Sequence, residues 1–171
     1  VTVYERSDRC GGLLMYGIPN MKLAKAVVQR RIDLMAELGV TFLTNVEVGR
    51  DISADELEAA YDRIIISAGA SVPRDLNIPG RALTGIQFAV DYLTAATKEV
   101  LNYGKAANES LAGKHVVVIG GGDTGNDCLG TAMRQGAASV RQLEITPKLP
   151  EQRLAGNPWP EYPMTAKIGY G

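Results

Sequence analysis

The sequence contains only two cysteines and one histidine among its 171 residues. Cys10 and Cys128 stand far apart, and neither belongs to a CxxC pair, so we expect no metal or cluster ligation within this chain. The formal net charge is only -1, from 18 basic and 19 acidic residues, and aromatics make up 6%. This composition gives no electrostatic reason to expect nucleic acid or an anionic membrane as a partner, and no aromatic platform for stacking bases.

Long apolar runs are also missing. No stretch approaches the roughly 20 apolar residues of a transmembrane helix, and the first residues do not form a signal peptide. Two unpaired thiols suit a reducing compartment, so we expect a cytoplasmic protein without membrane contact. The chain opens on Val1-Thr2-Val3-Tyr4-Glu5, a strand pattern without an initiator methionine, and we therefore expect an internal fragment of a longer protein.

Hydrophobic periodicity predicts an α/β fold with a parallel sheet and flanking helices. Alternating or wholly apolar segments predict strands, and amphipathic segments with capping signals predict helices. The expected strands are residues 1–5, 40–45, 63–67, 114–119 and 139–146. The expected helices are residues 22–38, 54–61, 86–101 and 124–135. A glycine-rich segment, residues 9–20, is expected to be a loop.

Two of the expected strands are unusually apolar. Residues 63–67, Arg-Ile-Ile-Ile-Ser, are typical of a strand buried on both faces of a parallel sheet. Residues 114–119 are likewise expected to form a buried strand. His115 lies at the start of that strand, where packing or a place at the strand edge is the expected role rather than catalysis.

A glycine motif follows the strand at 114–119 directly. Gly120, Gly122 and Gly125 form a GxGxxG pattern that also includes Asp123 and Thr124. Because this pattern joins a strand to a helix inside a βαβ unit of about 30 residues, it predicts a dinucleotide site. The first glycine permits the tight turn, the second lets the backbone approach the pyrophosphate, and the third lets helix and strand pack closely. The helix N-terminus then faces the phosphates.

The end of the following strand bears on the choice between NADH and NADPH. An acid at this place accepts a hydrogen bond from the adenosine ribose 2′-hydroxyl in NAD sites. Glu144 lies about 20 residues beyond the last glycine, near that location. Lys148 and Arg153 follow, and they could meet a 2′-phosphate. The residues alone leave both coenzymes open.

The first half carries features of an FAD site. Glu5 ends a β-branched strand, where a two-dinucleotide flavoprotein places the glutamate that holds the adenosine ribose of FAD. Gly11, Gly12 and Leu13 form a loop whose backbone a cofactor can approach closely. Ala68 and Gly69 end an apolar strand in the manner of FAD folds. The glycine loop that should precede the first strand is not in this chain, so we expect the chain on its own to bind FAD poorly or not at all.

Several runs together resemble the small (beta) subunit family of bacterial NADPH-dependent glutamate synthases. The resemblance covers essentially the whole chain. Single glycine motifs are shared with many flavin reductases, whereas their combination with the tail is specific to far fewer proteins. The runs are Glu5…Cys10-Gly11-Gly12-Leu13-Leu14, Tyr16-Gly17-Ile18-Pro19…Lys22-Leu23, Asn45-Val46-Glu47-Val48-Gly49, Gly120-Gly121-Gly122-Asp123-Thr124-Gly125-Asn126-Asp127-Cys128, Gln142-Leu143-Glu144-Ile145 and Asn157-Pro158-Trp159-Pro160.

The resemblance implies two nested dinucleotide domains, both truncated here. It implies a partial FAD domain at residues 1–101, a linker at 102–113 and a partial NADPH domain at 114–171. Carried over by position, the cofactor-binding residues are Glu5, Gly11, Gly12, Leu13, Val48, Ala68 and Gly69 for FAD, and Gly120, Gly122, Asp123, Thr124, Gly125, Glu144, Lys148 and Arg153 for NADPH. No catalytic residue is expected, because the cofactors perform the chemistry.

The family's activity follows as a further implication. Hydride passes from NADPH to FAD, and electrons pass through iron–sulfur clusters, whose cysteine-rich region is not in this chain, to a large (alpha) subunit that converts glutamine and 2-oxoglutarate to glutamate. Two other functions stay open. One is a related reductase subunit serving another acceptor, of the ferredoxin transhydrogenase or dihydropyrimidine dehydrogenase type. The other is a chain that binds nucleotide without turnover.

Overall fold

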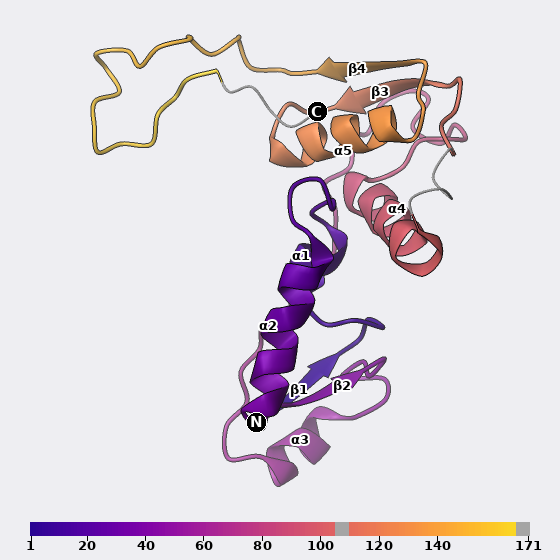
Figure 1. Cartoon of the computed structure of the whole chain (residues 1–171), viewed down its shortest axis with the longest axis vertical. Coiled ribbons are helices and arrows are strands. Elements are labelled where there is room, and N and C mark those ends of the chain that lie inside the picture. The colour runs from indigo at the N-terminus through magenta and orange to yellow at the C-terminus, as the bar shows by residue number, and fades with distance from the viewer. Residues whose placement is uncertain (105–109, 167–171) are drawn as a thin grey trace. The chain divides into compact units, whose positions relative to one another are not determined.

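The computed structural model describes residues 1–104 and 110–166 (Figure 1). The chain divides into two compact units, Val1–Asp91 and Tyr92–Gly171. Each unit contains one pair of parallel strands flanked by helices, which confirms the expected α/β fold. Within the described residues, no helix combines the length and the apolarity that crossing a membrane requires.

The first unit begins with β1, Thr2–Glu5, which pairs in parallel with β2, Thr41–Thr44. The chain between them forms α1, Gly12–Tyr16, and α2, Lys25–Glu37. After β2 comes α3, Ala54–Ala60. Ser53 caps α3 with a complete capping box, in which its hydroxyl accepts from the Glu56 amide while the Glu56 carboxylate accepts from the Ser53 amide. These two bonds fix where α3 begins, as the Ser-x-x-Glu spacing predicts.

Helix α1 corrects the expectation of a loop at residues 9–20. Propensity argues against a helix beginning on Gly12, but Met15 and Tyr16 are both buried. The Lys25 ammonium donates to two carbonyls at the C-terminal end of α1, those of Leu14 (2.9 Å) and Ile18. Burial of these side chains stabilises a short helix that propensity alone would not form, and the Lys25 ammonium satisfies carbonyl groups at its C-terminal end.

The second unit holds the parallel pair β3, His115–Ile119, and β4, Ser139–Leu143, in register from His115–Ser139 to Ile119–Leu143. Helix α5, Asp123–Arg134, connects the two strands and packs against one face of them (Figure 1). β3, α5 and β4 therefore form the predicted βαβ unit. The other face is open, since Val117 and Ile119 are 58% and 64% exposed. The expectation that β3 is buried is therefore wrong for that face.

Helix α4, Ala89–Tyr103, belongs mostly to the second unit. The Tyr92 hydroxyl donates to Oε1 of the buried Gln135 at 2.5 Å, just beyond α5. Leu93 and Ala96 of α4 are buried, as is Ala132 of α5. Contacts thus divide the chain into compact units between Asp91 and Tyr92, and the cofactor domains expected at residues 1–101 and 114–171 stay predictions. Residues 105–109 of the expected linker, and 167–171 of the tail, lie outside the described residues.

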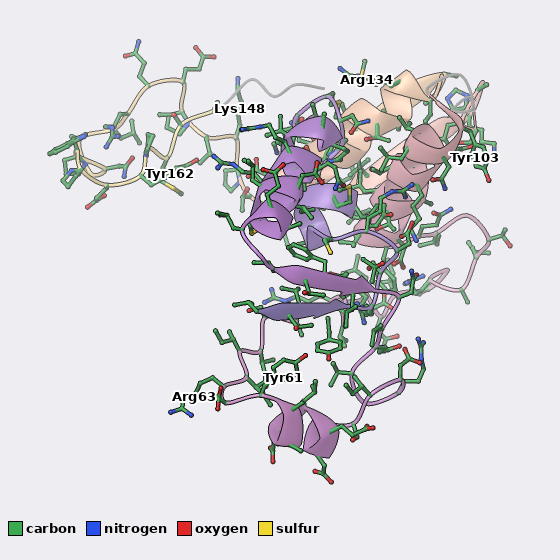
Figure 2. All side chains as sticks on the ribbon, turned by 60° about the horizontal axis from the view of Figure 1, so that its bottom comes forward. Tyr61, Arg63, Tyr103, Arg134, Lys148 and Tyr162 are labelled. Atoms are coloured by element: carbon green, nitrogen blue, oxygen red, sulfur yellow. The ribbon has the colours of Figure 1, made fainter. Side chains whose placement is uncertain are left out.

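The expected strand at residues 63–67 is wrong. This segment has no assigned strand and follows Tyr61 and the end of α3 (Figure 2). Ile65 and Ile66 are 88% and 87% exposed. A strand needs hydrogen bonds from a neighbouring strand, and among residues 1–104 and 110–166 no strand lies beside this segment. Its apolar composition alone cannot supply that partner.

Candidate functional site

The glycine turn links the end of β3 to the start of α5. Residues 121 to 124 are exposed, and α5 begins at Asp123 with Gly122 as its N-cap. No side chain caps the helix at that residue. The backbone of the turn, at the positive end of a 12-residue helix, therefore faces solvent where an anion can approach.

The three motif glycines are needed for three different reasons. Gly120 has φ +119°, a conformation that other residues rarely adopt. Gly125 sits so close to the turn that an added Cβ would overlap the Gly120 carbonyl oxygen. Gly122 has φ -75°, which any residue adopts, and a Cβ built on it would meet nothing within 4 Å. The fold of this chain therefore requires Gly120 and Gly125 but not Gly122.

That contrast identifies the space beside Gly122 as the candidate binding position. Neither backbone strain nor packing explains a glycine there. Glycine is a favoured N-cap residue, and here it also leaves the backbone at the start of α5 open to the approach of another molecule. The pyrophosphate role expected for the second glycine of the motif stays a prediction.

Strand β4 holds the turn in place. The Gly120 amide donates to the Leu143 carbonyl at 2.8 Å, and the Gln142 side-chain amide donates to the Gly120 carbonyl at 2.8 Å. Both polar groups of the Gly120 residue are thereby fixed. Sequence reasoning missed Gln142. The only signal was its place one residue before the end of a strand that neighbours a glycine turn.

Glu144 lies at the glycine turn, as its position after β4 predicts. Its carboxylate accepts from the Thr146 amide at 2.8 Å. A Cβ on Gly121 would overlap Oε2 of Glu144, so the carboxylate lies directly over the second residue of the turn. Hydrogen bonds from the Thr146 amide and hydroxyl, and from the amides of Ile145 and Gly121, hold the pKa of Glu144 below its usual range.

Lys148 and Arg153, the two cations expected near the coenzyme, make their contacts elsewhere. Lys148 lies on the loop that follows β4 (Figure 2), and its ammonium is 3.6 Å from Oε1 of Glu151, with both side chains more than 80% exposed. The Arg153 guanidinium donates to the carbonyls of Asn157 and Glu161 at 3.1 and 3.0 Å. Among the described residues, these bonds fold the tail upon itself and do not reach the glycine turn. The coenzyme roles of both cations stay predictions.

The expected FAD residues of the first unit are partly brought together. The Glu5 carboxylate accepts from the Ser7 amide at 2.8 Å and lies near Cys10, whose pKa is raised by burial and then by this carboxylate. Gly11, the next residue, has φ +114°. Leu13 is 61% exposed on α1. Glu5 and the Gly11–Gly12 turn thus lie in one neighbourhood.

The remaining FAD candidates stand apart. Val48 bridges to Ile52 in the turn after β2 and is 49% exposed. Ala68 and Gly69 are exposed beyond the apolar segment. Within the part of the chain that the structure describes, none of these three forms a backbone hydrogen bond with the Gly11–Gly12 turn. Their assignment to FAD stays a prediction.

A polar cluster that sequence reasoning missed supports the Gly11–Gly12 turn. The Tyr16 hydroxyl donates to Oδ1 of Asp8 at 2.7 Å and accepts from Nη1 of Arg9 at 2.8 Å. Arg9 also pairs with Asp8 at 3.0 Å. The three side chains bind the segment before the turn to the end of α1. Nothing in their spacing distinguishes them from solvated surface residues.

No metal site accompanies these features. Within residues 1–104 and 110–166, no three His, Cys, Asp or Glu side chains are arranged to hold an ion. Cys128 is buried in α5, and burial, with a smaller effect of Asp127, raises its pKa to about 11. Such a thiol stays protonated near neutral pH and is a poor nucleophile.

Comparisons with known proteins agree with a dinucleotide-binding fold. The profile of the family described as pyridine nucleotide-disulphide oxidoreductase matches residues 18–156. A glutamate synthase [NADH] of Saccharomyces cerevisiae is 55% identical over 100% of this chain, which spans 8% of that protein. A glutamate synthase [NADPH] small chain of Bacillus subtilis is 52% identical over 99% of this chain, which spans 35% of that protein.

Solved structures give the same fold. The structure of Mycobacterium tuberculosis FprA in complex with NADPH aligns with a TM-score of 0.64 and 25% identity, covering 82% of this chain and 35% of that one. This chain therefore spans about a third or less of the length of each of these three proteins.

Proposed function

Because this chain belongs to the pyridine nucleotide-disulphide oxidoreductase family, we propose that its second unit binds a reduced nicotinamide dinucleotide at the Gly120–Gly125 turn. The observation that carries the proposal is the glycine at position 122, which neither the backbone conformation nor the packing of this chain requires. The pyrophosphate of the coenzyme fits this position, because it can approach the bare backbone at the start of α5.

Each part of the turn has a definite task in holding the coenzyme. The backbone at the N-terminus of α5 offers amide groups and the positive end of the helix dipole to the phosphates. Gln142 and Leu143 fix the Gly120 residue, so the turn is organised before the ligand arrives. A site that is already ordered loses less conformational entropy on binding. Thr124, exposed in the first turn of the helix, stands beside the same space.

We propose that the first unit supplies part of an FAD site. Glu5 fits the adenosine ribose, because its carboxylate is held at the end of β1 by the Ser7 amide. The Gly11–Gly12 turn follows, and Gly11 has a positive φ. Gly12 is exposed, and a Cβ added to it would meet no atom within 4 Å. When bound, the two cofactors supply the hydride and electron chemistry, and the protein holds and orients them.

For the full-length protein we propose the reaction of a glutamate synthase small chain. Reducing equivalents pass from NADPH through FAD and iron–sulfur clusters to a large subunit, where glutamine and 2-oxoglutarate give glutamate. Support comes from two relatives that are each more than 50% identical to this chain, one named glutamate synthase [NADH] and one named glutamate synthase [NADPH] small chain. An electron acceptor of another kind would use the same two cofactor sites.

Two measurements on the full-length protein test these proposals separately. Titration with NADPH and NADH, followed by calorimetry, tests the nucleotide site; if neither coenzyme binds, the site at the glycine turn is wrong. Oxidation of the coenzyme in the presence of the large subunit, glutamine and 2-oxoglutarate tests the reaction. Binding without glutamate formation would retain the nucleotide site and reject glutamate synthase as the function.

A further inference from the structure

Asn45 has an unusual backbone conformation. Among residues 1–104 and 110–166 it is the one residue other than glycine with a positive φ, 59°. It comes directly after β2. Asparagine tolerates this left-handed conformation better than most residues, but the conformation still costs free energy. The Asn45 side chain is exposed and takes part in no hydrogen bond with the described residues. The position therefore requires a backbone conformation and not a side-chain contact.

The turn at Asn45 directs two successive amides toward the same neighbouring chain. In an extended strand successive residues face opposite sides, so two adjacent amides do not both bond to one neighbouring strand. Here the Asn45 amide donates to the Ser7 carbonyl at 3.0 Å, and the Val46 amide donates to the Glu5 carbonyl at 3.1 Å. The departure from extended backbone at Asn45 makes this pair of bonds possible.

The two bonds hold the segment that carries the Glu5 carboxylate. The Ser7 amide donates to Oε1 of Glu5 at 2.8 Å. Both polar backbone groups of Ser7 are therefore engaged, the amide by Glu5 and the carbonyl by Asn45. The Glu5 carbonyl is held in turn by Val46. Residues 5–7 are thus fixed where β1 ends, and the carboxylate is fixed with them.

We propose that Asn45 is a positioning residue for FAD, which holds residues 5–7 so that the Glu5 carboxylate meets the adenosine ribose. This inference rests on the FAD site proposed for the first unit, and it adds a residue that does not touch the cofactor. A strained backbone position persists where the surrounding structure maintains it, and such positions cluster at binding sites. Glycine adopts the left-handed conformation most easily, and β-branched residues adopt it least.

The test is the FAD affinity of the full-length protein, measured by flavin fluorescence as FAD is returned to the apoprotein. Asn45→Val should weaken binding roughly tenfold, because valine disfavours the left-handed backbone. Asn45→Gly should keep the wild-type affinity. The matched control is Gly39→Val, at the other end of the β1–β2 pair. Gly39 has φ 91°, and an added Cβ meets nothing within 4 Å. This control strains the same unit but should leave the FAD affinity unchanged.

A double-mutant cycle shows whether Asn45 acts through Glu5. Glu5→Gln alone should weaken FAD binding about tenfold, since it removes a charged acceptor. If Asn45 positions this carboxylate, Asn45→Val should cause little further loss once Glu5→Gln is present. A general loosening of the unit would instead give additive losses in the double variant.

The outcomes separate this inference from the FAD site on which it rests. Wild-type affinity in Glu5→Gln would reject the FAD site at Glu5. If Glu5→Gln binds weakly, three results reject the role of Asn45 and leave the site standing. These are wild-type affinity in Asn45→Val, an equal loss in Asn45→Gly or Gly39→Val, and additive losses in the double variant. If Asn45→Val does not fold, Asn45→Ala, which lacks the branch at Cβ, replaces it in the same cycle with a smaller expected loss.

Discussion

In both units a glutamate at the end of a strand has its carboxylate held by the backbone, but the surroundings of the two glutamates differ. Glu5 and Glu144 each accept from the amide two residues further along, at 2.8 Å. In the second unit the glycine turn of the neighbouring strand lies under the carboxylate, at Gly121. In the first unit the acid is followed by Gly11 and Gly12, and β1 and β2 are its only strands among the described residues.

This difference shows which parts of a dinucleotide site this chain supplies. A complete cradle needs a glycine turn for the pyrophosphate and an acid for the ribose. The second unit has both on one βαβ unit, whereas the first has the acid and a later turn. Nucleotide binding by this chain is therefore expected at the second unit, and the following predictions test that assignment.

The largest effect is expected at Gly122. Gly122→Val places a branched side chain in the open space beside the turn, and it should weaken nicotinamide dinucleotide binding at least about a hundredfold, or about 3 kcal/mol. The fold should be retained, because the backbone φ is ordinary and no atom lies within 4 Å of the new Cβ, and the poorer N-cap should cost only about 1 kcal/mol. Titration calorimetry measures the affinity.

The matched control is Gly156→Val, the same substitution in the tail, where an added Cβ also meets nothing within 4 Å. It should retain wild-type affinity. Equal affinity for Gly122→Val and wild type would show that the space beside Gly122 is not used by a ligand.

The third motif glycine should behave in the opposite way. In Gly125→Ala the new methyl group overlaps the Gly120 carbonyl oxygen, and such overpacking costs roughly 1–3 kcal/mol of folding free energy. Urea denaturation, followed by a probe in the second unit, measures the loss. Gly122→Ala, three residues earlier, is the control and should lose only the smaller free energy of a less favourable N-cap, since its Cβ meets no atom. Equal stability of the two variants would contradict the distinct roles given to these glycines.

A smaller effect tests where the units divide. Tyr92→Phe removes the part-buried hydrogen bond from its hydroxyl to Oε1 of the buried Gln135. We expect a loss of about 1–2 kcal/mol, confined to the second unit. Hydrogen exchange of amides in α5 should speed up accordingly. Tyr103→Phe, at the exposed end of α4, should have no effect. Faster exchange only in β1 and β2 would assign Tyr92 to the first unit.

The smallest effect is expected at the N-terminus of α3. Ser53→Ala removes the capping hydroxyl and should destabilise this helix by about 1 kcal/mol, seen as faster amide exchange. Hydrogen bonds from the Ser53 amide and hydroxyl lower the pKa of Glu56. The capping contribution is therefore fully present above the usual glutamate pKa of about 4.3 and is lost as the pH falls through the lowered value. If the protection of the α3 amides, taken as their exchange rate relative to the intrinsic rate at each pH, does not fall in this window, the capping box is contradicted.

The sequence predicted the second unit better than the first. Gly120, Gly122 and Gly125, the flanking strands and α5 all follow from local patterns, because a βαβ turn places its motif within a short stretch of chain. Glu144 was also expected at the turn, by spacing alone. Gln142 was missed, since its bond to the Gly120 carbonyl depends on register between two strands, which residue patterns do not report.

The errors of prediction share a physical origin. Residues 63–67 have the composition of a buried strand, but a strand forms only beside a partner, and composition does not report whether one is present. Helix α1 depends on burial of Met15 and on the Lys25 ammonium at its end, both tertiary effects. Local propensity cannot anticipate contacts of this kind.

The most direct test of the nucleotide assignment is hydrogen exchange of the full-length protein with and without saturating NADH. Bound coenzyme should slow exchange of the amides at residues 121–126, where the glycine turn enters α5, and leave those at Gly11 and Gly12 unchanged. Slowing confined to Gly11 and Gly12, or no change in either turn despite measured binding, would contradict a nicotinamide dinucleotide site in the second unit.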